Sequence, residues 1–110
     1  MVQRIIPELS NGEFERFVKG EFVVVSFFKE WCMNCLMMNP IFEEASEKFL
    51  DKIKFAKINV EDNREIMRKF EINSTPYFII FKGGCVCGKF GKTSCVEEFE
   101  EKLKEFLIKN

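Results

Sequence analysis

The sequence has no histidine, and this absence excludes several kinds of active site at once. Zinc sites built from cysteine and histidine are excluded, as are mechanisms in which an imidazole takes the proton. The 17 basic and 18 acidic residues leave a net charge of −1, so no basic surface for nucleic acid is expected. The longest apolar runs are much too short to span a bilayer. We therefore expect neither a nucleic-acid nor a membrane partner.

Two more features are missing, a secretory signal and a disulfide scaffold. Residues 1–7 lack the apolar stretch of a signal peptide, so we expect a cytoplasmic protein; the alternative is a mature form whose leader has been removed. The five cysteines are an odd number, and they lack the spacing of a disulfide-stapled secreted domain. No linker rich in proline, glycine or serine interrupts the 110 residues. The chain therefore suits one domain, 1–110, with a hydrophobic core of its own.

The chain does contain a Cys-x-x-Cys motif, from Cys32 to Cys35. The run before it, 22–28, is β-branched and aromatic except at Ser26, which predicts a strand buried on both faces. The segment 32–49 has helical spacing. A helix N-terminus has unpaired N–H groups and partial positive charge, and both favour a thiolate, the species that attacks disulfides. The position therefore indicates redox chemistry; the alternative is a pair of buried structural cysteines.

The hydrophobic pattern elsewhere predicts alternating strands and helices. Strands are expected at 2–9, 22–28, 54–60, 77–81 and 85–90, and helices between Ser10 and Gly20, at 32–49, after Asp62 or Asn63, and after Ser94. The long helix has apolar residues at helical spacing: Leu36, Pro40 and Ile41, then Phe42, Ala45 and Phe49. The order βαβαβαββα implies an α/β fold: a mixed five-stranded sheet flanked by four helices.

These motifs resemble the thioredoxin family over nearly the whole chain. The matching residues are Glu30-Trp31-Cys32-Met33-Asn34-Cys35, Pro40, Ala56-Lys57-Ile58-Asn59-Val60, Ser74-Thr75-Pro76-Tyr77, Phe81-Lys82-Gly83-Gly84 and Gly91. A bare Cys-x-x-Cys is a weak signal, but the preceding tryptophan, the proline five residues after the second cysteine and the later Thr-Pro make it specific. The resemblance implies the thioredoxin fold and a thiol–disulfide oxidoreductase.

The resemblance also implies roles for individual residues. Cys32 would be the exposed nucleophile and Cys35 the more buried resolving thiol, joined by a disulfide when oxidised, and the bond before Pro76 would be cis. Five residues are expected to frame a groove for protein substrates that contain disulfides: Trp31, Met33, Thr75, Pro76 and Gly91. Met33 would add a flexible apolar contact, or is only an exposed residue at a helix start.

The resemblance also implies a source of electrons. A flavoenzyme resembling thioredoxin reductase would supply them, no prosthetic group is expected, and we expect a monomer.

Three positions depart from the family pattern. Met33-Asn34 stands where Gly-Pro is usual, Phe28 where tryptophan is usual, and Ser26 where the family has a buried acid. A hydroxyl is not a base at neutral pH, so Ser26 cannot take the proton of Cys35. We expect resolution to be slower, or to be assisted by water, by Glu30 or by Glu61.

The three other cysteines leave several possibilities open. Cys85 and Cys87 lie on one face of a predicted strand, which indicates ordinary packing or a second redox pair. With Cys32 and Cys35 they would supply the four thiolates of a zinc or iron–sulfur site. Cys95, at a helix start, is a surface thiol or forms a regulatory or intermolecular disulfide. Beside the oxidoreductase, a binding or chaperone-like module and a metal carrier therefore remain as alternatives.

Overall fold

The computed structural model describes residues 6–109, which form four helices and four strands. In chain order these are α1 (Asn11–Phe17), β1 (Val23–Phe28), α2 (Met33–Lys48), β2 (Lys54–Asn59), α3 (Arg64–Lys69), β3 (Tyr77–Lys82), β4 (Cys85–Phe90) and α4 (Val96–Lys109). Each matches an element predicted from the sequence, with small shifts at its ends. None of the helices in this part of the chain is long and apolar enough to cross a membrane.

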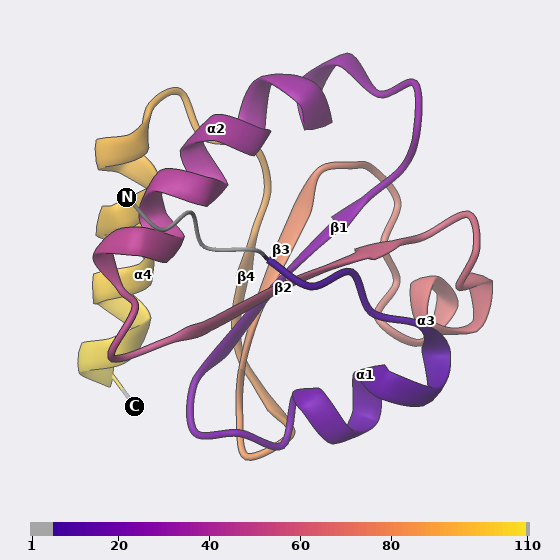
Figure 1. Cartoon of the computed structure of the whole chain (residues 1–110), viewed down its shortest axis with the longest axis horizontal. Helices are drawn as coiled ribbons and strands as arrows, with labels where there is room; N and C mark the ends of the chain where they lie inside the picture. Colours follow the sequence, from indigo (N-terminus) through magenta and orange to yellow (C-terminus); the bar gives the residue numbers. More distant parts are fainter. Residues whose placement is uncertain (1–5, 110) are drawn as a thin grey trace.

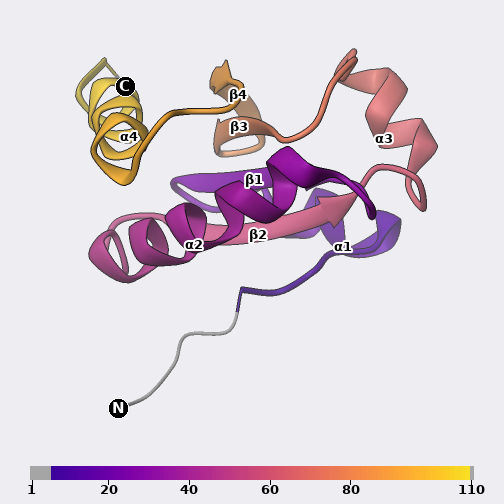
Figure 2. The same ribbon diagram turned by 90° about the horizontal axis from the view of Figure 1, so that it is seen from above.

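The strands form one mixed sheet in the order β2-β1-β3-β4. β1 runs parallel to β2 and antiparallel to β3, and β4 runs antiparallel to β3. Helices α2 and α4 lie on one face of the sheet, while α1 and α3 lie on the other (Figures 1 and 2). The end of β1 and the start of β3 therefore meet at one edge, because Phe27 pairs with Tyr77. This edge carries the site described below.

The predicted fifth strand, 2–9, is wrong for the part that the structure describes. Around Glu8 there is a single bridge to Lys57, held by the bonds Lys57 N to Pro7 O (2.9 Å) and Leu9 N to Lys57 O (2.8 Å). Pro7 has no N–H to donate, so the ladder does not extend through it. Residues 2–5 of the predicted strand lie outside the described residues.

Two aromatic cores, one on each face, hold the helices to the sheet. Phe14 of α1 packs edge-on against Phe81, and Phe99 of α4 packs edge-on against Phe78. Full burial of such a side chain contributes roughly 1.5–3 kcal/mol to folding. Alternate residues of β1 belong to the two cores, as predicted for a strand covered on both faces.

The apolar residues at helical spacing on α2 are not all buried. The buried residues of this helix are Cys35, Met38, Phe42, Ala45 and Ser46, whereas the side chain of Leu36 is exposed. The core-facing row begins at Cys35, which places Leu36 a further 100° or so around the helix, toward solvent. The pattern of apolar residues did not distinguish the two rows.

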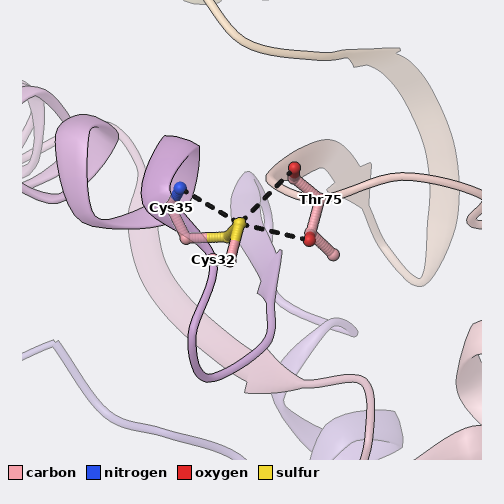
Figure 3. Close-up of a disulfide and its surroundings, with 3 residues drawn as sticks. All are labelled: Cys32, Cys35 and Thr75. Atoms are coloured by element: carbon pink, nitrogen blue, oxygen red, sulfur yellow. Dashed lines mark hydrogen bonds between the residues drawn. A yellow bond between two sulfur atoms is a disulfide. The ribbon is translucent and has the colours of Figure 1, made fainter.

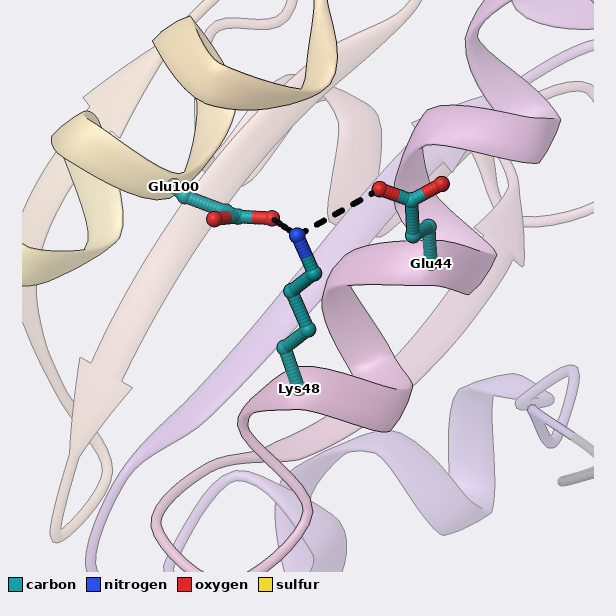
Figure 4. Close-up of polar contacts among 3 residues, drawn as sticks. All are labelled: Glu44, Lys48 and Glu100. Carbon is teal, nitrogen blue, oxygen red and sulfur yellow. Dashed lines mark ion pairs between the residues drawn. The ribbon is translucent and has the colours of Figure 1, made fainter.

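An ion pair links the two helices on the α2 face. Lys48 Nζ lies 3.0 Å from Glu100 Oε2 and 3.5 Å from Glu44 Oε2 (Figure 4). The hydrogen bond to Glu100 is the main reason that the pKa of Lys48 is raised above its ordinary value. The contact joins α2, which carries the cysteine motif at its other end, to α4.

Candidate active site

Cys32 is the N-cap residue of α2, with extended backbone at φ −109° and ψ 108°. Its Sγ accepts a hydrogen bond from the backbone N–H of Cys35 at 3.2 Å. A sulfur in this position satisfies one of the unpaired donors of the first helical turn. No acidic side chain lies in that turn to oppose the positive end of the helix dipole. The helix terminus therefore favours negative charge on this sulfur.

Cys32 and Cys35 form a disulfide, with their Cα atoms 5.2 Å apart (Figure 3). Three residues correspond to nearly one helical turn, so the second cysteine lies close to the first. Cys35 faces the core and is only 5% exposed, whereas Cys32 lies at the surface end of the motif. The structure thus has the disulfide pairing that the resemblance implied.

The segment before β3 lies against the sulfur of Cys32 (Figure 3). Thr75 Oγ1 donates a hydrogen bond to Cys32 Sγ at 3.4 Å, and the carbonyl oxygen of Thr75 lies 3.6 Å from the same sulfur. A disulfide sulfur carries no hydrogen, so the carbonyl contact becomes a hydrogen bond only in the reduced thiol. The bond between Thr75 and Pro76 is cis, as the resemblance implied.

Two other residues predicted to frame the site are strongly exposed. The side chain of Trp31 is 97% exposed, on a backbone with a left-handed φ of 58°. Met33 begins α2 and is also exposed. Leu36 and Met37 are exposed as well, and the sequence analysis did not identify them as part of the site. Their spacing from Met33, three and four residues along a helix, was the available signal.

Gly91, the last residue predicted to frame the site, follows β4 at the same edge of the sheet as Pro76, since Phe90 pairs with Phe78.

Two pockets flank the cysteine motif. The first has a volume of about 350 Å³ and is mostly apolar; it is lined by Phe28, Lys29, Glu30, Trp31, Cys32, Cys35, Leu36 and Asn39. The second, of about 310 Å³, is more polar and is lined by Lys29, Val60, Glu61, Arg64, Met67, Ile72, Asn73, Ser74 and Thr75. Sequence reasoning singled out Glu30 and Glu61 together, but the structure places them in different pockets.

Ser26 stands on β1 beside Lys57 of β2, and its side chain is buried. Within residues 6–109 no hydrogen bond to the Ser26 hydroxyl is present. The ammonium group of Lys57 lies 5.8 Å from the centre of the Phe28 ring. The charge of Lys57 therefore rests over an aromatic face rather than beside a carboxylate.

Cys85 and Cys87 lie on β4, away from the motif. Cys85 pairs with Lys82 at the end of β3 opposite to Pro76, so the four thiols that a metal cluster would need do not converge. In the described part of the chain, no group of three or more His, Cys, Asp or Glu side chains is placed to hold a metal ion. Cys87 is half-buried, and burial raises the pKa of its thiol.

A surface thiol at a helix N-terminus, bonded to a buried partner one turn along, is the arrangement of a thiol–disulfide oxidoreductase. Comparison with known proteins agrees. The family model described as Thioredoxin matches residues 5–107. The thioredoxin of Alicyclobacillus acidocaldarius is 42% identical over 100 residues, which cover 90% of this chain and 95% of the relative. A thioredoxin of Buchnera aphidicola from Schizaphis graminum is 34% identical over 107 residues, covering 96% and 95%.

A solved structure is similar as well. The oxidised form of mitochondrial thioredoxin 3 from Saccharomyces cerevisiae superposes with a TM-score of 0.81 at 26% identity, covering 91% of this chain and 94% of the other. The chain therefore belongs to the thioredoxin family. It has the family fold and the redox-active cysteine pair, and it is a protein-disulfide oxidoreductase.

Proposed function

We propose that Cys32 attacks disulfides of protein substrates and that Cys35 resolves the mixed disulfide. One observation carries this assignment: Cys32 Sγ caps α2, accepts the Cys35 N–H at 3.2 Å and lies at the surface end of the pair. In the first step the Cys32 thiolate bonds to one target sulfur and displaces the other. Cys35 then attacks Cys32, which releases the reduced target and leaves the Cys32–Cys35 disulfide.

The substrate surface proposed here consists of Trp31, Met33, Thr75, Pro76 and Gly91. An exposed tryptophan and methionine support it, because large apolar side chains in water mark interaction sites. Thr75 and Pro76 contribute backbone beside the reacting sulfur, and the Thr75 carbonyl is already within 3.6 Å of it. An extended substrate segment would lie across this backbone.

The physiological setting is part of the proposal. The chain works as one domain, 1–110, and as a monomer in the cytoplasm, where it carries electrons from a reductase resembling the flavoenzyme thioredoxin reductase to target proteins. The electrons pass through sulfur alone, so no prosthetic group is required.

The test is reduction of insulin by dithiothreitol, followed by turbidity, with the parent protein and the variants Cys32→Ser and Cys35→Ser. The parent should accelerate precipitation, and both variants should lose the effect. A binding or chaperone-like module is the second candidate, favoured by the exposed Leu36 and Met37 beside the motif. If the protein is such a module, both variants should still change the aggregation of insulin chains, as the parent does.

A further inference from the structure

The resolving step needs a proton acceptor that residue 26 does not provide. Residues alternate between the two faces of a strand, and Val24 packs in the core beneath α2, so Ser26 and Phe28 face α2 as well. Ser26 is 7% exposed, and its hydroxyl takes no proton from a thiol at neutral pH. Cys35, at 5% exposure, has little direct contact with bulk water. The proton must leave by another route.

The apolar pocket supplies that route. Cys35 and Glu30 both line it, and its volume is about 350 Å³. A water molecule occupies roughly 30 Å³ in the liquid, so a pocket of this volume has room for several water molecules. Glu30 is exposed, while Cys35 is buried in the first turn of α2. A proton can therefore pass from the sulfur to the carboxylate without a direct contact.

The other charged groups near the motif do not compete for this role. Glu61 and Arg64 line the polar pocket, which Cys35 does not border. Lys29 lines both pockets, and Lys57 lies over Phe28, but both are cations. The first turn of α2 has no acidic residue. Among the residues that line the apolar pocket, Glu30 is the one carboxylate.

We infer that Glu30 accepts the proton of Cys35, through water in the apolar pocket, during the resolving step. The inference rests on the proposed function. The Cys35 thiolate attacks Cys32 Sγ of the mixed disulfide, the Cys32–Cys35 bond forms and the bond from Cys32 to the target sulfur breaks. The target leaves as a thiolate and takes a proton from solvent. Two electrons pass from the dithiol to the target, which is reduced.

The sign of the effect separates a proton acceptor from a mere neighbouring charge. A carboxylate near a thiol opposes ionisation of that thiol, so removing the charge alone would speed the resolving step. Removing a proton acceptor would slow it. Glu30→Gln should therefore slow the resolving step if Glu30 accepts the proton, and speed it if Glu30 is only a neighbouring charge.

The experiment uses the full chain with Cys85→Ser, Cys87→Ser and Cys95→Ser, so that only the motif reacts. One equivalent of a chromogenic aryl disulfide is mixed with the reduced protein in a stopped-flow instrument between pH 5.5 and 9. The first release of coloured thiolate reports attack by Cys32, and the second reports resolution by Cys35. Glu30→Gln should slow the second phase about tenfold at pH 7, a modest effect for general-base catalysis, and leave the first within twofold.

Two variants complete the test. Glu61→Gln, a matched loss of one carboxylate in the other pocket, should leave both phases unchanged, and adding Ser26→Asp to Glu30→Gln should restore the second phase. A second phase that is unchanged or faster in Glu30→Gln across the pH range overturns the inference, as does equal slowing by Glu61→Gln. A missing first phase in the background protein contradicts the proposed function itself.

Discussion

The hydroxyl of Thr75 donates a hydrogen bond to Cys32 Sγ at 3.4 Å, between residues 43 positions apart in the chain. This contact joins the loop before β3 to the N-cap of α2. With the Cys35 N–H it gives the sulfur two donors from two separate segments. Hydrogen bonds to a charged form favour that form, so both contacts stabilise the Cys32 thiolate.

Thr75→Val should therefore slow the reaction of Cys32 with iodoacetamide at pH 7. A net hydrogen bond of about 1 kcal/mol corresponds to roughly a fivefold loss of rate. The matched control is Thr93→Val, which removes a buried hydroxyl that donates to the carbonyl of Cys95 instead. An equal rate in Thr75→Val and the parent would show that the hydroxyl does not act on the sulfur.

The Trp31→Gly variant should be more stable than the Trp31→Ala variant. Its side chain is 97% exposed, so truncation loses little packing, but its φ of 58° is a region that side chains with a Cβ disfavour. Glycine relieves this strain, and we expect Trp31→Gly to exceed Trp31→Ala by about 1 kcal/mol in free energy of unfolding. Urea denaturation of the two variants measures the difference. At an ordinary position the alanine variant would be the more stable one.

Gly88→Ala should destabilise the fold, because a Cβ there would overlap the ring of Phe106 in α4. Overpacking of this kind costs typically about 1–3 kcal/mol. Gly12→Ala is the control, since a Cβ at Gly12 meets nothing within 4 Å beyond its chain neighbours and the backbone of its own helix, and alanine in a helix gains up to about 1 kcal/mol over glycine. The two should shift the denaturation midpoint in opposite directions.

Cys87 should be the slowest of the three free thiols to react in the oxidised protein. Burial raises the pKa of its thiol, so less of it is thiolate at pH 8, and its rate should still be rising at pH 9. Cys85 and Cys95 are exposed and should be modified first. Mass mapping after short alkylation gives the order, and early labelling of Cys87 would place its sulfur at the surface.

Because of the ion pair of Lys48, we expect the melting temperature to fall as the pH becomes alkaline. The pKa of Lys48 is raised from 10.5 chiefly by Glu100, so the contribution is complete below pH 10.5 and is lost as the pH rises through the higher folded value. Lys48→Met should lower the melting temperature at pH 8 more than Glu44→Gln does, because it leaves the largely buried Glu100 without its partner. If the two variants lower the melting temperature equally, the Lys48–Glu100 pair does not stabilise the packing of α2 against α4.

Most of the fold was predictable because short-range patterns agree with the tertiary structure. The run 22–28 predicts a doubly covered strand, and the structure has β1 there with its core residues buried on both faces. The Cys32–Cys35 pair was recognisable because the strand ends just before it and the helix begins with it. These features depend on the order of residues alone.

The remaining features depend on packing that no single segment encodes. Leu36 fits an apolar helical row, but the row that faces the sheet begins at Cys35. Nothing in the sequence around Trp31 predicts its left-handed backbone, which belongs to the connection from β1 to α2. Glu30 and Glu61 looked equivalent as candidate bases, and the placement of one in each pocket follows from how three loops meet.

The most direct test of the central assignment is to trap the mixed disulfide. Cys35→Ser, mixed with a disulfide-linked peptide, should accumulate one covalent adduct, and peptide mapping should locate it at Cys32. Cys32→Ser under the same conditions should give none at Cys35. An adduct mainly at Cys85, Cys87 or Cys95, or none at Cys32, would contradict the account.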